Sequence, residues 1–485
     1  MSMFKWEVVD PAPDEAVAPH QRLPWGKTVG LGAQHVVAMF GATFVFPLIM
    51  GLNANLAIMM SGIATICFLL IVKGKVPSYL GTSAAFVGGA AAIYAQNGGP
   101  EDVTGAILIS GVVLALVGAL IHFVGTDMLN RVLPPVVTGA VVMLIGFNLA
   151  PVATNVYMPA DYWIALLTMA AVIFMAVGLR GFAGRIAIFL GLLFGYVVSF
   201  LADKMFGQIT SVTPDSAGEA VKHWRVDWTM VKEADWFGFP VHTADGLVGS
   251  QAFTDGYAKV GWHAPSFSIG FALLVLPAVI ALVAENVGHV KAVADMTKTD
   301  LDPMMGRAVA GDGVGTVIAT AVGGSPTTTY AENIGVMAAT KVYSTAAYFV
   351  AAGVAILLGL VPKFGQIINA TPPAVLGGIT LVLYGMIGLL GAKIWKENNV
   401  DFSRPLNLVP VAAGLIMGIG LGTDRFFPVT ENFTLGGIAI GTLIIVIGYH
   451  LARLMAPARD RDGGSVITIG QAGSQTQLGD EPETR

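Results

Sequence analysis

The chain has 485 residues, of which 55% are hydrophobic and 12% are charged, and its formal net charge at pH 7 is −5. Soluble domains carry about 25% charged residues, so this chain, with a mean hydropathy of +0.72, has too little polar surface for a water-facing body. The composition excludes a soluble enzyme, a nucleic-acid binder and a disordered protein, and the single cysteine, Cys67, excludes an intramolecular disulfide. The sequence therefore predicts an integral membrane protein.

Apolar runs of about 20 residues, the length that a membrane-spanning helix needs, recur along the chain. They predict an all-α membrane protein with fourteen transmembrane spans, the third and tenth of them short, at residues 28–50, 54–72, 82–95, 103–124, 133–153, 160–179, 185–202, 266–290, 307–322, 326–340, 344–361, 372–392, 406–422 and 433–455. The spans fall into two groups of seven, which divide the chain into an N-terminal segment (1–26), a first repeat (27–202), a long loop (203–265), a second repeat (266–456) and a disordered polar tail (457–485).

The positions of the basic residues indicate which side of the membrane each loop faces, because short cytoplasmic loops hold the excess of Lys and Arg. With a cytoplasmic N-terminus, twelve of them fall in short inside loops and two, Lys363 and Arg425, in short outside loops. This distribution predicts a multi-pass protein of the inner (cytoplasmic) cell membrane with both termini in the cytoplasm and the loop 203–265 outside.

Two internal similarities are separated by seven spans. Residues 133–139 (LPPVVTG) open the fifth span and residues 371–377 (TPPAVLG) open the twelfth, and the short third and tenth spans have the same separation. A repeat of seven spans places its second copy upside down in the membrane. The pattern therefore predicts inverted repeats, which favour a carrier over a channel or a receptor.

Both short spans begin with sequence that is unfavourable for a helix. Residues 81–86 (GTSAAF) and 323–330 (GGSPTTTY) follow flexible glycines, and the second stretch contains a proline and three threonines. Unpaired backbone groups are tolerated at membrane depth only against protein or a water-filled cavity. We therefore expect two extended segments that lead into half-helices, whose N-terminal N–H groups would point at a ligand.

Carboxylates inside spans are costly and are treated as functional candidates. Glu285 lies in span eight and Glu332 in span ten, just after the extended segment. His289 shares a helix face with Glu285, so it can hydrogen-bond the carboxylate and take part in a proton relay. The ordinary alternative is a buried polar pair that closes a helix interface.

Weaker candidates are His35 in span one and Asp312 in span nine for proton transfer, and Tyr384 in span twelve for substrate binding. An interface histidine, a helix-capping aspartate and a packing tyrosine are the alternatives. Two carboxylates, backbone donors and aromatic faces suit a small planar solute with imide N–H groups and carbonyls. Carboxylates would repel an anion.

Residues 332–341 (ENIGVMAATK) resemble the signature of the nucleobase–ascorbate (nucleobase–cation symporter 2) transporters: an acid or Gln, Asn-x-Gly, four residues, Thr and a basic residue. Residues 34–35 (QH), 81–83 (GTS) and 284–289 (AENVGH) support the resemblance. Residues 284–289 and 134–143 are similar to the bacterial uracil permeases, especially the pyrimidine-utilisation branch.

This resemblance implies seven-plus-seven inverted repeats, with spans 1–4 and 8–11 in a core domain and spans 5–7 and 12–14 in a gate domain. It also implies alternating access and a homodimer formed through the gate. In such permeases the glutamates matching Glu285 and Glu332 hold the base, the histidine matching His289 supports proton coupling, and backbone amides at the positions of Ala84 and Ala331 complete the site, beside Tyr330. Ser83 and Asn333, which belong to the matched motifs, join the candidate binding residues.

Two departures from the uracil-permease pattern bear on selectivity: Ala84 stands where a Phe is usual, and Ala331 replaces a Gly. The missing Phe enlarges the pocket and admits thymine or xanthine, although purine carriers usually have Gln where Glu332 stands.

We expect a proton-coupled importer of uracil or a related nucleobase, with a xanthine or purine symporter and an anion carrier of the related sulfate or bicarbonate type as alternatives. Sodium coupling stays open, and no catalytic activity, metal or cofactor is expected.

Overall fold

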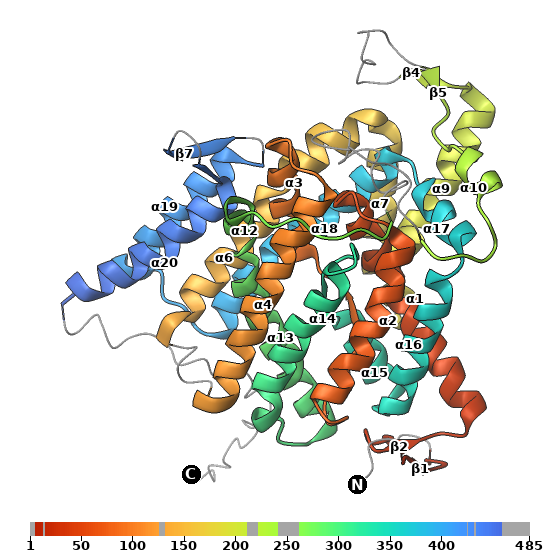
Figure 1. Ribbon diagram of the computed structural model, residues 1–485, viewed down its shortest axis with the longest axis horizontal. Helices are drawn as coiled ribbons and strands as arrows, with labels where there is room; N and C mark the ends of the chain where they lie inside the picture. Colours follow the sequence, from red (N-terminus) through yellow and green to blue (C-terminus); the bar gives the residue numbers. More distant parts are fainter. Residues whose placement is uncertain are drawn as a thin grey trace, which may run out of the picture.

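Helices fill most of the computed structural model, which describes residues 5–12, 15–125, 131–210, 222–240, 261–423, 425–430 and 433–457 (Figure 1). The all-α prediction is confirmed, and a helix lies in each of the fourteen predicted spans. The predicted tail lies outside the described residues from position 458 onward, and so do residues 211–221 and 241–260 of the predicted loop.

Long helices alternate with short helical and extended elements. In the first half of the chain these are β1 (Glu7–Val8), β2 (Gln21–Arg22), α1 (Trp25–Ile49), α2 (Ala54–Ile71), β3 (Leu80–Thr82), η1 (Ala84–Phe86), α3 (Val87–Ala95), α4 (Pro100–Val124), α6 (Pro135–Asn148), η2 (Val152–Tyr157), η3 (Met158–Ala160), α7 (Tyr162–Gly178), α8 (Gly181–Arg185) and α9 (Ala187–Phe206). They are followed by β4 (Ile209–Thr210), β5 (Lys222–His223), α10 (Thr229–Glu233), α12 (Ile269–Val275), α13 (Ala278–Thr297), η4 (Asp302–Met304), α14 (Met305–Thr320), β6 (Thr327–Thr329), α15 (Ala331–Thr340), α16 (Thr345–Gly359), α17 (Pro362–Asn369), α18 (Pro373–Glu397), α19 (Pro405–Leu421), β7 (Phe426–Thr430), β8 (Phe433–Gly436) and α20 (Gly437–Met455).

Seven helical segments among the described residues are each long and apolar enough to cross a membrane: α1, α2, α4, α6 together with η2 and η3, α9, α18 and α20. Two further candidates are bent pairs, in which α12 meets α13 at 41° and α16 meets α17 at 81°. These helices support the prediction of a multi-pass membrane protein. The number of fourteen crossings and the inverted orientation of the two halves stay predictions.

The helix packing is similar in the two halves of the chain. α4 packs along α14, and α2 packs along α16. Seven predicted spans separate α4 from α16, and seven separate α2 from α14. The contact between α2 and α16 is therefore the counterpart of the contact between α14 and α4. α6 packs against α18, its counterpart, at a close approach that glycines permit: a Cβ on Gly146 would overlap the backbone of Gly388. This is the pattern that the predicted repeat requires.

The two predicted extended segments are confirmed, and they pair with each other. β3 and β6 form an antiparallel two-stranded sheet with Gly81 opposite Thr328. The pairing continues beyond the strands, because Ser83 N donates to Pro326 O at 2.9 Å and Tyr330 N donates to Tyr79 O at 3.2 Å. Every residue of both strands is buried. The pairing therefore satisfies, inside the protein, backbone groups that lipid would leave unpaired.

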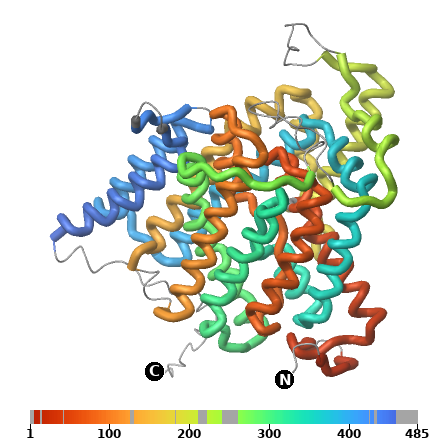
Figure 2. The backbone as a smooth tube through the Cα atoms, in the orientation of Figure 1, coloured from red at the N-terminus to blue at the C-terminus, as the bar shows by residue number. Residues whose placement is uncertain are grey.

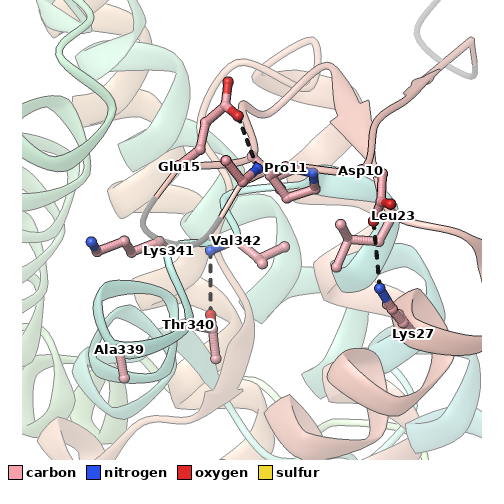
Figure 3. A pocket seen from close by; sticks show the side chains of 11 residues that line it. Asp10, Pro11, Glu15, Leu23, Lys27, Ala339, Thr340, Lys341 and Val342 are labelled. Atoms are coloured by element: carbon pink, nitrogen blue, oxygen red, sulfur yellow. Dashed lines mark hydrogen bonds and ion pairs between the residues drawn. The ribbon is translucent and has the colours of Figure 1, made fainter.

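The N-terminal segment docks on the turn between α15 and α16. Val17 N donates to Lys341 O at 2.9 Å, and Tyr343 N donates to Val17 O at 2.8 Å. Val17 is buried, and it packs in a small apolar cluster with Val342. Figure 3 shows this junction around a pocket of about 330 Å³, in which Lys27 forms an ion pair of 3.5 Å with Asp10.

The described part of the predicted extracellular loop folds back on the ends of α7 and α9. Arg225 is nearly buried, and its Nε donates to Asp161 Oδ2 at 2.8 Å while its Nη1 donates to Asp203 Oδ1 at 3.2 Å. Asp161 also caps the first turn of α7. This loop and the N-terminal segment lie at opposite ends of the helical bundle (Figure 2), as the predicted sidedness requires.

Candidate functional site

A cavity of about 970 Å³ lies among α6, α13, α18 and the two paired extended segments. Its polar lining at the strand pair consists of Thr82, Glu285, His289, Thr328, Tyr330 and Glu332, together with the small residues Ala84, Ala85, Gly288 and Ala331. Apolar residues of α6 and α18, among them Val142, Ile145, Leu383 and Ile387, also line the cavity. The cavity thus combines polar groups from spans three, eight and ten with an apolar wall.

Two helices begin at the cavity. The 3-10 turn η1 that leads into α3 starts at Ala84, directly after β3, and α15 starts at Ala331, directly after β6. The first N–H groups of an α-helix have no partner within the helix, and the helix dipole makes this end favourable for an electronegative atom. Because Ala84 and Ala331 carry only methyl groups, a ligand can approach the backbone closely at both positions.

The structure brings Glu285 and Glu332 to the same cavity from two different elements. Glu285 projects from the middle of α13, and Glu332 lies in the first turn of α15. Their positions differ by 47 in the chain, and α14 and β6 lie between them in the sequence. A ligand in the cavity therefore meets two carboxyl groups and two helix starts.

His289 is held by the strand β6. Its Nδ1 lies 2.8 Å from Thr329 Oγ1, and Asn286 Nδ2 donates to the same oxygen at 3.4 Å. The neighbouring Thr328 Oγ1 donates to Asp312 Oδ2 at 3.1 Å. Asp312 is completely buried in α14 and does not line the cavity. Side chains from α13 and α14 are thus linked through two successive threonines of β6.

Tyr330 joins β6 to β3 and α1. Its hydroxyl donates to Thr82 O at 2.5 Å, and Thr43 Oγ1 donates to its Oη at 3.3 Å. The ring lies so close to Gly81 that a Cβ there would be 2.6 Å from it. Gly81 is therefore required by the close approach of this ring.

Besides Asp312, four of the predicted site residues lie outside the lining of the cavity. Ser83 is buried and accepts from Ala85 N at 3.3 Å, which caps η1. Asn333 Nδ2 donates to His35 O at 2.9 Å and lies 3.2 Å from His35 Nδ1, so these two residues join α15 to α1. Tyr384 is buried in α18 beside the lining residue Leu383. Their part in binding or proton transfer stays a prediction.

Sequence reasoning missed several lining residues. The sequence places Thr82 and Thr328 in the extended segments but does not indicate that both border the cavity. The apolar wall from α6 and α18 carries no signal in the sequence, because Val, Ile and Leu are equally suited to face lipid. No group of three or more His, Cys, Asp or Glu side chains is placed to hold a metal ion in the part of the chain that the structure describes.

Residues 26–425 match the xanthine/uracil permeases, described as a permease family. The chain belongs to this family. The predicted resemblance is therefore confirmed, and the permease is a transport protein rather than an enzyme, since its relatives are named permeases. Together with the apolar helices, the family identifies a multi-pass protein of the cell membrane.

Curated relatives match nearly the whole chain. A protein of Escherichia coli (strain K12) named as a pyrimidine permease, RutG, is 43% identical over 453 residues, which are 91% of this chain and 94% of the relative. The uracil permease of Bacillus subtilis (strain 168) is 32% identical over 86% of this chain and 91% of its own. A uracil permease of E. coli (strain K12) is 34% identical over 88% of this chain and 92% of its own.

Solved structures share the fold of the permease at low sequence identity. The transmembrane domain of a cyanobacterium bicarbonate transporter, BicA, aligns with a TM-score of 0.50 and 13% identity over 88% of this chain and 96% of that chain. The murine anion transporter Slc26a9 in its inward-facing state aligns with a TM-score of 0.57 and 11% identity over 88% of this chain and 68% of that chain. These likenesses concern the fold alone.

Proposed function

We propose that the permease imports uracil or a closely related nucleobase across the cell membrane. The observation that carries this proposal is the cavity into which Glu285, Glu332 and the helix starts at Ala84 and Ala331 all converge. The relatives named as uracil and pyrimidine permeases support the same solute class.

The donors and acceptors of the cavity are complementary to a pyrimidine ring. A carboxylate accepts hydrogen bonds, so Glu285 and Glu332 would receive the ring N–H groups of uracil. The backbone N–H groups at Ala84 and Ala331 would donate to its two carbonyls. Charge-assisted hydrogen bonds to a desolvated carboxylate are stronger than neutral ones, which would let a small neutral solute bind in competition with water.

Proton coupling would act at the same place. His289 borders the cavity four residues after Glu285 and is bonded to Thr329, whose neighbour Thr328 is bonded to the buried Asp312. A charge that crosses the membrane interior is costly, so uptake of a proton with the solute would reduce the net negative charge with which the loaded site moves. A pH gradient would then drive import.

Alternating access would expose this site to each side in turn by moving the core domain, which contains α13 and α15, against the gate domain, which contains α6 and α18. The cavity extends along α13 and α18 to their C-terminal ends, where Lys291, Asp295, Lys393 and Glu397 line it. These ends are cytoplasmic in the predicted orientation, and a cavity that reaches them would belong to an inward-facing state of such a cycle. The homodimer through the gate domain belongs to the same proposal.

A xanthine or purine symporter is the second candidate, and the short side chains of Ala84 and Ala85 favour it because they leave room for a second ring. The third candidate is an anion carrier, because the solved structures that share the fold are of bicarbonate and anion transporters. Two carboxyl groups in the cavity would, however, repel an anion.

Purified permease in proteoliposomes tests the proposal. Labelled uracil should accumulate when an inward proton gradient is imposed, and a sodium gradient alone should not drive it. Unlabelled thymine and xanthine are added as competitors to rank the solutes, with cytosine and bicarbonate for comparison. If uracil neither binds nor accumulates but xanthine or an anion is taken up strongly, then uracil is not the substrate, and the solute that is taken up is.

A further inference from the structure

The cytoplasmic end of the cavity carries a charge arrangement that substrate binding does not use. On α13, Lys291 is followed one turn later by Asp295, and on α18, Lys393 is followed one turn later by Glu397. All four residues line the cavity. One pair comes from the proposed core domain and the other from the proposed gate domain, so each domain presents one cation and one anion across the mouth.

The ion pairing within the two helices is unequal. Lys393 Nζ lies 3.6 Å from Glu397 Oε1, with both side chains at least half exposed. Lys291 and Asp295 form no ion pair within 4 Å among the described residues. In this state Asp295 is therefore available to a cation. Lys393 is held by a solvated contact within its own helix, and such a contact is weak.

The directions of the helices decide which exchange is possible. α13 belongs to predicted span eight and α18 to predicted span twelve, and in the predicted topology both spans run from the outside to the cytoplasm, so the two helices run parallel. Each of the two parallel helices carries its acid one turn after its lysine. When one helix is shifted along the other by one turn, about 5.4 Å, the acid of the first helix lies level with the lysine of the second. From a register in which the two lysines are level, an outward movement of the core domain by one turn would bring Asp295 level with Lys393 and would take Lys291 away from Glu397.

We propose that Asp295 and Lys393 form an ion pair that closes the cytoplasmic mouth of the cavity when the substrate site turns to the outside. Lys393 exchanges Glu397 for Asp295 on closing and returns to Glu397 on opening. Closure removes water from the mouth, so the cross-helix pair is screened less than the exposed pair that it replaces. The proposal rests on alternating access as proposed above.

Cysteine cross-linking tests the approach of the two helices without any substrate. The variant combines Asp295→Cys and Lys393→Cys with Cys67→Ser, and disulfide formation is induced with copper phenanthroline in native membranes. The matched control replaces Lys393→Cys by Lys396→Cys, a residue that is exposed on the same helix end but does not line the cavity. We expect a disulfide in the first variant, little in the control, and loss of labelled uracil uptake that a reductant reverses.

Charge exchange gives a second, independent readout. Asp295→Lys and Lys393→Asp should each lower uracil uptake by about fivefold, the effect of one ion pair of this kind, and the double exchange should restore most of it. All variants are checked by size-exclusion chromatography and thermal unfolding. The proposal is overturned if the disulfide forms equally in the control, does not form, or leaves uptake unchanged, or if the double exchange is no better than the single ones. If the unmodified permease takes up no uracil, the proposal that uracil is the substrate is refuted. The cross-linking comparison still shows whether Asp295 and Lys393 approach each other.

Discussion

His289 and Asp312 are bonded to successive residues of a single short strand, His289 to Thr329 at 2.8 Å and Asp312 to Thr328 at 3.1 Å. His289 lines the cavity, whereas Asp312 is buried in α14 and does not line it. The strand that precedes the Glu332 half-helix therefore carries the polar connection between these two groups.

The first prediction concerns this connection. Thr329→Val keeps the shape of the side chain but removes the oxygen that partners His289 and Asn286. A buried polar group without its partner costs about 1–3 kcal/mol, so proton-driven uptake should fall about tenfold and its dependence on pH should change. The matched control is Thr327→Val on the same strand, because Thr327 Oγ1 has no hydrogen-bond partner among the described residues. Equal effects of the two variants would contradict a specific role of Thr329.

The second prediction separates binding from coupling. Glu332→Gln replaces an acceptor oxygen by a donor, so equilibrium binding of labelled uracil should weaken by about a hundredfold, and Glu285→Ala should weaken it at least as much. His289→Leu should leave binding measurable but make uptake independent of the pH gradient. Glu233→Gln on the exposed helix α10 is the control and should be neutral. Normal pH-driven uptake in all three cavity variants would refute the site.

The third prediction concerns the size of the cavity. Ala84→Phe adds an aromatic ring at the start of η1, where the cavity is lined by a methyl group. The ring should exclude a bicyclic base more strongly than a pyrimidine, so the ability of xanthine to compete with labelled uracil should fall about tenfold. Competition curves measured for the two bases before and after the substitution give the ratio. An unchanged ratio would show that Ala84 does not limit the solute.

The fourth prediction concerns the described part of the predicted extracellular loop. Arg225→Met leaves Asp161 and Asp203 without their cation at a nearly buried site. Removing one partner of a buried ion pair costs about 3–5 kcal/mol, so the apparent melting temperature in detergent should fall by several degrees. Lys232→Met on α10 removes a neighbouring positive charge that no ion pair holds among the described residues, and it should leave the melting temperature unchanged. A similar loss in both variants would point to net charge rather than to the Arg225 contacts.

The class of the protein and its broken helices follow from the sequence alone. Twenty-residue apolar runs have few solutions other than helices in a membrane, and glycine, proline and three successive threonines make residues 323–329 poor helix sequence. The spacing of Glu285 and His289 places them on one helix face in any helix. These conclusions rest on local conformational preferences, which need no knowledge of distant segments.

The tertiary structure decided which distant segments meet. The pairing of Gly81 with Thr328 joins residues almost 250 positions apart, and neither strand's sequence specifies its partner. The contact of Asn333 with His35, the apolar wall from Val142 and Leu383, and the presence of Asp295 and Lys393 in the lining of one cavity depend in the same way on how helices pack. In lipid, apolar side chains facing a helix, a cavity or the bilayer are chemically alike, so only the packing of the whole chain distinguishes them.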